Sequence, residues 1–119
     1  MSTELGSGSI KKDPLEYKKI TTFFVPLDFR NLVALKRKEG KVKNLSKLIR
    51  LLVRYAADHK DNIGPIPSYP DKVSLIQTNI AIRDMMLLDE FSKRFNVSRS
   101  DVVIYLLEKY FNGEIEVSE

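Results

Sequence analysis

Two amide side chains, Gln77 and Asn79, stand at alternate positions in the stretch SLIQTNIAIRD, which covers residues 74–84. A primary amide donates and accepts hydrogen bonds at the same time, so a pair of amides can bind a surface that presents both kinds of group. The surrounding residues favour a β-strand, in which residues two apart lie on the same face. The sequence therefore predicts a strand with a row of amides on one side.

Catalytic chemistry has little support in this chain. There is no cysteine, and the single histidine, His59, stands between Asp58 and Lys60, a context typical of a solvated helix end. The sequence contains no glycine-rich phosphate loop, no nucleophile elbow and no pair of clustered carboxylates. We therefore expect a protein that is not an enzyme, with no cofactor, no metal site and no small-molecule substrate.

Positive charge is concentrated in one part of the chain. Residues 30–60 contain ten Lys or Arg and two Asp or Glu, whereas residues 71–119 contain six and nine, respectively. A basic segment of this size predicts a polyanionic partner. The alternative is a solvated lysine-rich face, as heat-stable proteins often have.

The length of 119 residues is typical of one domain, or of two small modules that share a core. No apolar run approaches the ~18 residues of a membrane span, and the start of the chain lacks the apolar segment of a secretory signal. We therefore expect no membrane partner and a cytoplasmic location, with which the absence of cysteine is consistent.

One pattern occurs twice. The segment NLSKLIRLLVRYAA (44–57) aligns with SRSDVVIYLLEKYF (98–111), and ITTFFVPLDFRNLVALKRKEG (20–40) aligns with LIQTNIAIRDMMLLDEFSKRFN (75–96). In both copies a β-prone run precedes two helical patterns. The predicted organisation is a flexible N-terminal arm (1–17), a first repeat (18–59), a proline-rich linker (60–71), a second repeat (72–112) and a short acidic tail (113–119).

Capping residues mark the ends of the predicted helices. Gly40 ends the first helix, and Asn44 is the expected N-cap of the second. Asn96 is the expected left-handed cap of the third helix, and Ser98 with Asp101 forms a capping box for the fourth. The first three helices are predicted over 27–39, 45–59 and 82–95, and the fourth follows Ser98.

Apolar residues on these helices predict their buried faces. In the first helix the stripe is Phe29, Leu32, Val33 and Leu35. In the third it is Met85, Leu88 and Phe91. The second helix is predicted to bury Leu48, Ile49, Leu52, Val53 and Ala56.

Neither repeat can form a stable core alone, because one strand and two short helices amount to about 45 residues. Each strand would also leave both of its edges unpaired. The predicted fold is mainly α, with the two strands paired as an antiparallel ribbon over four interleaved helices. The tandem repeats would then form an intramolecular pseudodimer.

This arrangement resembles the ribbon-helix-helix transcription regulators of the Arc and MetJ type. The resemblance lies in IQTNIA…MLLDEF…NVSRSDVVIYLLEKY and in TFFVPLDFRNLVALK…KNLSKLIRLLVRY, and covers residues 18–58 and 72–112. Tandem single-chain members of this kind are similar to regulators encoded by archaeal filamentous viruses. The resemblance implies a sequence-specific regulator that binds double-stranded DNA, in the host cytoplasm if the chain is viral.

In this family the ribbon lies in the DNA major groove, and the residue before the strand–helix junction, here Ile80, packs inward. That parity places Leu75, Gln77 and Asn79 outward, where Gln and Asn side chains can bind adenine. The alternative is a strand whose amides only meet solvent.

The first strand fits the pattern less well. The same parity places Ile20, Thr22 and Phe24 outward, with Phe24 able to contact thymine methyl groups or sugars. A slip by one residue would reverse the assignment, because both faces hold one Thr and two apolar residues. The expected base-contacting residues are therefore Leu75, Gln77, Asn79, Thr22 and Phe24.

The resemblance also implies phosphate contacts at the N-termini of the second helix of each repeat, where free amides and the helix dipole favour an anion. Flanking basic residues would add charge, although a solvated-loop role is the alternative for the lysines. The expected phosphate-contacting residues are Ser98, Arg99, Ser100, Asn44, Ser46, Lys41, Lys43, Lys47, Lys18 and Lys19.

The two repeats differ in charge, so we expect an asymmetric pair of half-sites and self-association of several copies along the duplex. Two alternatives remain at this stage. An antitoxin-type regulator usually carries a longer C-terminal segment than this chain has, and an oligomerisation or adaptor module would not need the basic segment.

Overall fold

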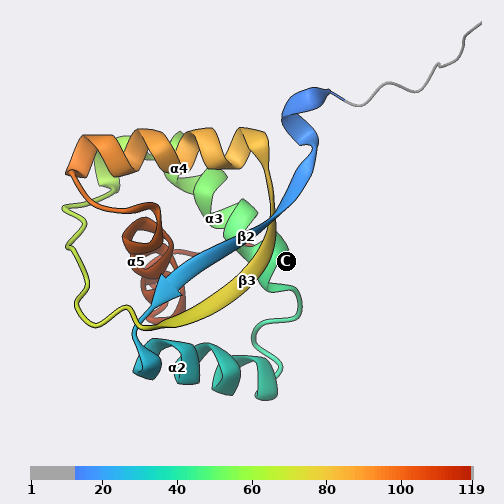
Figure 1. The fold of residues 1–119 in the computed structure, drawn as a ribbon, viewed down its shortest axis with the longest axis vertical. Coiled ribbons are helices and arrows are strands. Elements are labelled where there is room, and N and C mark those ends of the chain that lie inside the picture. Colours follow the sequence, from blue (N-terminus) through green and yellow to red (C-terminus); the bar gives the residue numbers. More distant parts are fainter. Residues whose placement is uncertain (1–12, 119) are drawn as a thin grey trace, which may run out of the picture.

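The computed structural model describes residues 13–118 and consists of a two-stranded antiparallel sheet with four α-helices (Figure 1). Of the predicted flexible arm, residues 1–12 lie outside the described residues. The elements, in chain order, are the 3-10 helix η1 (Pro14–Glu16), β2 (Lys18–Val25), α2 (Leu27–Lys38), α3 (Leu45–Asp58), the 3-10 helix η2 (Lys60–Asn62), β3 (Ser74–Ala81), α4 (Ile82–Phe95) and α5 (Arg99–Phe111). The predicted order of strand, helix, helix in each half is confirmed.

The two strands come from opposite halves of the chain and pair along their full length. Their register runs from Lys18 opposite Ala81 to Val25 opposite Ser74. Thr22 lies directly opposite Gln77 in the middle of this ribbon. Lys18 and Lys19 therefore belong to the strand itself, at the end that lies next to α4.

Every predicted cap is present. The Asn44 side chain accepts the Lys47 N–H at 3.0 Å, and Asn96 has left-handed backbone angles (φ 55°, ψ 50°). Ser98 and Asp101 exchange hydrogen bonds of 2.9 and 3.1 Å, which completes the capping box. Local side-chain chemistry thus fixes where these helices start and stop.

The core lies between the inner face of the ribbon and the helices α3 and α5. The predicted buried residues of α3 are all buried, and α5 is buried without interruption from Ser100 to Leu107. On the ribbon, Phe23, Val25, Ile76 and Ile80 close the core from the other side. Burial on several sides explains why α5 is apolar around most of its circumference.

α2 and α4 lie on opposite sides of the ribbon, at the bottom and top of Figure 1. α2 packs chiefly against β3 and buries only Phe29 and Val33 fully. Leu35 was predicted to belong to the apolar stripe of this helix. That prediction is wrong, because the Leu35 side chain is 49% exposed. Leu35 lies about 200° around the helix from the buried Val33, so its side chain points away from the packed face of α2.

The segment predicted as a linker belongs partly to the core. Ile63 and Ile66 are buried, and the Gly64 N–H donates to the Tyr105 hydroxyl of α5 at 3.0 Å. Gly64 has φ of +97°, and an added Cβ would lie 2.3 Å from the Phe95 ring. This segment therefore passes tightly over α4 and α5 on its way to β3.

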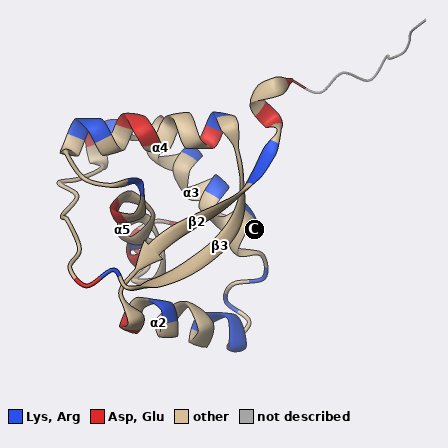
Figure 2. Ribbon diagram, in the orientation of Figure 1, with Lys and Arg blue, Asp and Glu red and all other residues tan. Residues whose placement is uncertain are grey.

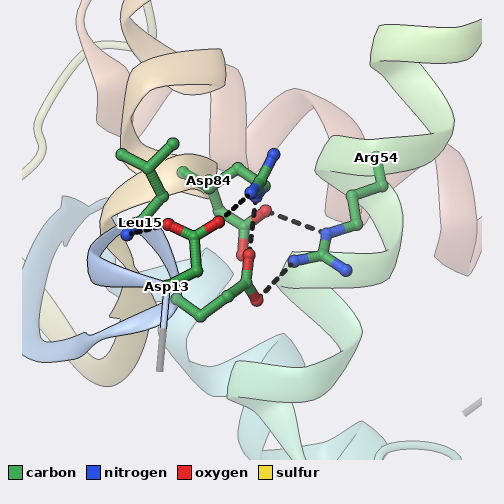
Figure 3. A network of polar contacts seen from close by, with 6 residues as sticks. Asp13, Leu15, Arg54 and Asp84 are labelled. Carbon is green, nitrogen blue, oxygen red and sulfur yellow. Dashed lines mark hydrogen bonds and ion pairs between the residues drawn. The ribbon is translucent and has the colours of Figure 1, made fainter. Parts of the chain in front are cut away.

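An ion-pair network fixes the last residues of the predicted arm (Figure 3). Arg83 of α4 donates to Glu16 at 2.6 Å and to Asp13 at 2.9 Å, and Arg54 of α3 lies 3.4 Å from Glu16. The Arg83 hydrogen bond, opposed in part by desolvation, lowers the pKa of the Glu16 carboxyl below its ordinary value. η1 is thereby attached to both α3 and α4.

Candidate nucleic-acid interface

The outward face of the ribbon carries three cross-strand pairs: Ile20 with Asn79, Thr22 with Gln77, and Phe24 with Leu75. All six side chains are exposed, while their neighbours Phe23, Val25, Ile76 and Thr78 are buried. The parity predicted for β3 is therefore confirmed, and of the two assignments left open for β2 the structure has the one with Ile20, Thr22 and Phe24 outward. The five expected base-contacting residues lie on this one face, and Ile20 is its sixth member.

This outward face changes in character along its length. Phe24 and Leu75 form an apolar end, to which the exposed Val73, just before β3, adds. Gln77 and Asn79 lie toward the other end, where β2 begins with two lysines. A ligand on this surface would meet only apolar groups at the Phe24–Leu75 end, and hydrogen-bonding groups together with the exposed Ile20 at the other end.

Two serines bind the ribbon to the helices beneath it. The Ser46 hydroxyl of α3 accepts the Asn79 N–H at 2.9 Å, and the Ser100 hydroxyl of α5 accepts the Phe24 N–H at 2.9 Å. Both residues were expected at phosphates, and in the structure their side-chain oxygens accept hydrogen bonds from strand N–H groups. Each bond places a helix N-terminus directly beside an edge of the ribbon.

A basic pocket of about 110 Å³ lies beside the N-terminus of α3. Lys47 and Arg50 of α3 and Lys18 of β2 supply its cations, and the helix dipole adds positive potential. Its lining is Lys18, Asn44, Ser46, Lys47, Arg50, Asn79, Ala81 and Asp84. Helix geometry leaves the N–H groups of Leu45 and Ser46 without intrahelical partners, so the pocket suits an anion.

Arg50 and Asp84 give this pocket two unsatisfied polar atoms. Among residues 13–118, Arg50 Nε and Asp84 Oδ2 are buried without a protein hydrogen-bond partner. The other carboxylate oxygen of Asp84 accepts from Arg54 Nε at 3.1 Å. Charged groups of both signs thus border the same small space, with the positive groups in excess.

The N-terminus of α5 has a different environment. Lys72 Nζ lies 2.7 Å from Asp101 Oδ1, and the Tyr69 N–H donates to the same oxygen at 2.9 Å. Burial alone would raise the pKa of the Asp101 carboxyl, but the hydrogen bonds from Lys72, Tyr69 and Ser98 outweigh it and lower that pKa. Lys72, which precedes β3, therefore neutralises the Asp101 carboxylate at this helix end.

The Tyr69 side chain completes this cluster. Its hydroxyl donates to Glu108 of α5 at 2.8 Å. Burial, followed by the hydrogen bond to Glu108, raises the pKa of the Tyr69 phenol well above its ordinary range. This phenol consequently stays protonated and acts as a donor at physiological pH.

The remaining expected phosphate contacts are distributed around the ribbon. The Arg99 guanidinium is paired with Asp89 of α4, and Lys41 lies 3.7 Å from Glu39. Lys19, Lys43 and Lys47 are exposed. Figure 2 shows that the Lys and Arg segments gather on α2 and α3, whereas α4 and α5 carry both signs.

Four basic residues near the ribbon were missing from the expected site: Arg50, Lys72, Arg30 and Arg37. Arg50 lies one helical turn after Ser46, so the helical period from the predicted phosphate site could have indicated it. Lys72 is the first residue of the predicted second repeat, and Arg30 and Arg37 belong to a helix that was predicted only to pack. Their positions depend on how the segments meet in space.

The described residues contain no group of three or more His, Asp or Glu side chains arranged to hold a metal ion. None of the helices in residues 13–118 is long and apolar enough to cross a membrane. Comparisons of the chain with protein-family models, curated proteins and solved structures find no match. Inferences about function consequently rest on the residues of this chain and on their geometry.

Proposed function

We propose that this protein is a sequence-specific, double-stranded DNA-binding transcriptional regulator built as a tandem ribbon-helix-helix pseudodimer. The observation that carries the proposal is the outward face of the ribbon, which combines three hydrogen-bonding side chains with three apolar ones and has the Thr22–Gln77 pair at its centre. A two-stranded ribbon of this kind fits the major groove, in which base pairs expose donors, acceptors and thymine methyl groups.

Pseudo-twofold symmetry supports the pseudodimer. Thr22 and Gln77 are equivalent in the two sequence repeats, and they are also cross-strand partners. The two serine bonds are equivalent as well, because Ser46 matches Ser100 and Asn79 matches Phe24. Each serine holds the strand of the other repeat, as two identical subunits would do across a dyad.

In the proposed complex, Gln77 and Asn79 make the base contacts that specify sequence. An amide side chain can pair with the donor and acceptor of adenine at once, and a good bidentate pair is worth about 1–3 kcal/mol of discrimination. Phe24 and Leu75 supply apolar contacts to thymine methyl groups. Thr22, near the dyad, can donate to or accept from a base on either strand.

The pocket beside the N-terminus of α3 supplies the main phosphate contact, through Lys47, Arg50 and the free helix amides. The α5 end is proposed to contribute less, because Asp101 offsets Lys72 and Asp89 offsets Arg99. Binding is therefore directional, with unequal half-sites. We propose that several copies associate along the duplex, since one small interface gives limited affinity.

Selection of bound sequences from a random duplex pool, followed by binding assays on variants, tests this proposal. Gln77→Ala is expected to lose about tenfold in preference for the selected sequence and to keep its affinity for random duplex. Lys47→Ala is expected to weaken binding to all sequences and to reduce the salt slope by about one.

Two outcomes would contradict the proposal. If the wild-type chain shows no salt-dependent shift of duplex DNA, DNA binding is excluded. If Gln77→Ala and Lys47→Ala have the same effect on all sequences, the proposed division between base and phosphate contacts is wrong.

A non-DNA-binding oligomerisation or adaptor module is the second candidate, favoured by the exposed apolar side chains on the ribbon. Ile20 is 77% exposed, Phe24 53% and Leu75 47%. Exposed apolar residues grouped on one face are typical of protein interfaces. The same duplex-shift assay separates the two candidates, because this one predicts self-association that DNA does not affect.

A further inference from the structure

A second groove runs beside the ribbon, between α2 and β3. Its volume is about 440 Å³, and its polar lining comes from Arg30, Asn31 and Arg37 of α2 and from Gln77 of β3. Leu75 borders it as well, so the groove is continuous with the outward face of the ribbon. A ligand on that face would reach this groove without a gap.

The two arginines are placed along one side of α2. They are seven residues apart, which is about two helical turns, so their side chains lie on the same face of the helix. Ala34, between them, is small and leaves the groove open. Among residues 13–118, no ion pair or side-chain hydrogen bond involves Arg30 or Arg37, whereas Lys36 and Lys41 share Glu39.

The edge of β3 adds hydrogen-bond donors to the same groove. The Asn79 N–H points away from β2, because it donates to Ser46 of α3. In an antiparallel ribbon, residues two and four positions away direct their N–H groups to the same side. The N–H groups of Gln77 and Leu75 therefore also lie on the free edge, facing the groove.

We infer that this groove binds the sugar–phosphate backbone of the duplex that the ribbon engages, with Arg30 and Arg37 as its phosphate-binding residues. The inference rests on the proposed DNA-binding function. Two guanidiniums without an ion-pair partner among the described residues give the groove its positive charge, and the amides of Asn31 and Gln77 with the strand N–H groups add further donors, which suits phosphate oxygens. The occupant is a DNA backbone because the groove opens directly onto the base-contacting side chains.

The other half of the molecule has no equivalent groove chemistry. The residues of α4 that match Arg30, Asn31 and Arg37 in the repeat are Met85, Met86 and Ser92. α2 thus adds phosphate contacts on one side of the ribbon only. We expect these contacts to fix the direction in which the protein lies on DNA, beyond their effect on affinity.

The double variant R30Q/R37Q tests this inference against the matched control K38Q/K93Q. The control removes the same charge from exposed lysines on α2 and α4 that do not line the groove. R30Q/R37Q is expected to lose at least about tenfold in affinity and about two from the salt slope, whereas the control changes little. The variant R30K/R37K is expected to keep most of the affinity for random duplex.

Direction on DNA can be measured by tethered cleavage. The chain has no cysteine, so Met86→Cys provides a single attachment point for an iron chelate on α4, away from the groove. With the wild-type groove we expect cleavage on one side of the selected site. With R30Q/R37Q we expect cleavage on both sides.

The outcomes separate this inference from the proposed function. If the wild-type chain binds DNA and R30Q/R37Q matches K38Q/K93Q in affinity and cleavage pattern, the groove inference is overturned and the proposed function stands. If the wild-type chain does not bind duplex DNA, both are overturned. Equal thermal unfolding of both double variants establishes that any difference in binding is not a folding defect.

Discussion

Two buried aspartates, Asp84 and Asp101, occupy the same position in different helices and have different surroundings. Each is the third residue of its helix, and their exposures are 0% and 1%. Asp101 binds Ser98, Tyr69 and Lys72, so both of its oxygens have partners. Asp84 binds Arg54, and its second oxygen has no protein partner within residues 13–118.

This difference in hydrogen bonding between Asp84 and Asp101 indicates different roles for the two ends of the ribbon. At the α5 end, the carboxylate is fully hydrogen-bonded, and its partners hold the residues before β3 against the helix. At the α3 end, the carboxylate borders a pocket in which Arg50 is also incompletely bonded. Satisfied buried polar groups stabilise a fold, whereas unsatisfied ones are common where a ligand binds. We therefore expect the α5 end to contribute more to stability, and we propose the α3 end as the main binding end.

The largest expected effect that tests this comparison is that of Asp101→Asn. Loss of the charge leaves Lys72 without its counter-ion and disrupts the capping box, so the free energy of unfolding should fall by about 2–4 kcal/mol. Asp84→Asn should cost less than about 1 kcal/mol, because Arg54 is partly exposed and also lies near Glu16. Urea unfolding of both variants measures the difference, and equal losses would contradict the assignment.

A smaller difference is expected between the two serines that hold the strands. Ser100→Ala should cost about 1–2 kcal/mol, because it leaves the Phe24 N–H without a partner at a buried site. Ser46→Ala should cost about 0.5–1 kcal/mol, since Ser46 is only half-buried and solvent can reach the Asn79 N–H. Thermal and urea unfolding of both variants provide the test. A larger loss for Ser46→Ala would reverse the ranking of the two ends.

The smallest expected effect is a loss of unfolding free energy at acid pH, caused by protonation of Asp101 at the α5 end. The pKa of Asp101 is lower in the folded state than in the unfolded state, where it should be about 3.9. The unfolded chain therefore binds more protons in this range, and the contribution of Asp101 is complete above about pH 4 and is lost as the pH falls through the folded pKa.

Urea unfolding at pH values from 2 to 6 tests this expectation. In Asp101→Asn the acid-dependent part of the stability should be smaller than in the wild type. An Asp101→Asn profile as steep as that of the wild type would show that other carboxylates cause the acid loss.

Much of the fold could be predicted from sequence, because it depends on local chemistry. Asn44, Asn96 and Ser98 mark helix ends through hydrogen bonds that reach at most four residues along the chain. The alternation in β3 predicted which of its residues face outward. In β2 both faces have a similar mix of Thr and apolar residues, so the sequence does not decide which face points outward. In the structure, Phe23 and Val25 pack into the core, and this determines the outward face.

Long-range contacts explain what could not be predicted. Ile63 and Ile66 stand among prolines and a glycine, so their sequence context indicates a linker, although both are buried. Leu35 was predicted as part of an apolar stripe but is 49% exposed, because it lies on the opposite side of α2 from the buried Val33. The hydroxyls of Ser46 and Ser100 were expected at phosphates, and they bind strand N–H groups whose positions depend on the other repeat.

The sequence by itself determined the elements, their caps, the repeat and the side of β3 on which Gln77 and Asn79 lie. These features follow from backbone periodicity and from hydrogen bonds between near neighbours. Only the tertiary structure decided that Arg30 and Arg37 line a groove beside Gln77, that Lys72 neutralises Asp101, and that Arg50 and Asp84 share a pocket. Each of these depends on the pairing and packing of segments distant in the chain, and residue spacing carries no direct information about such contacts.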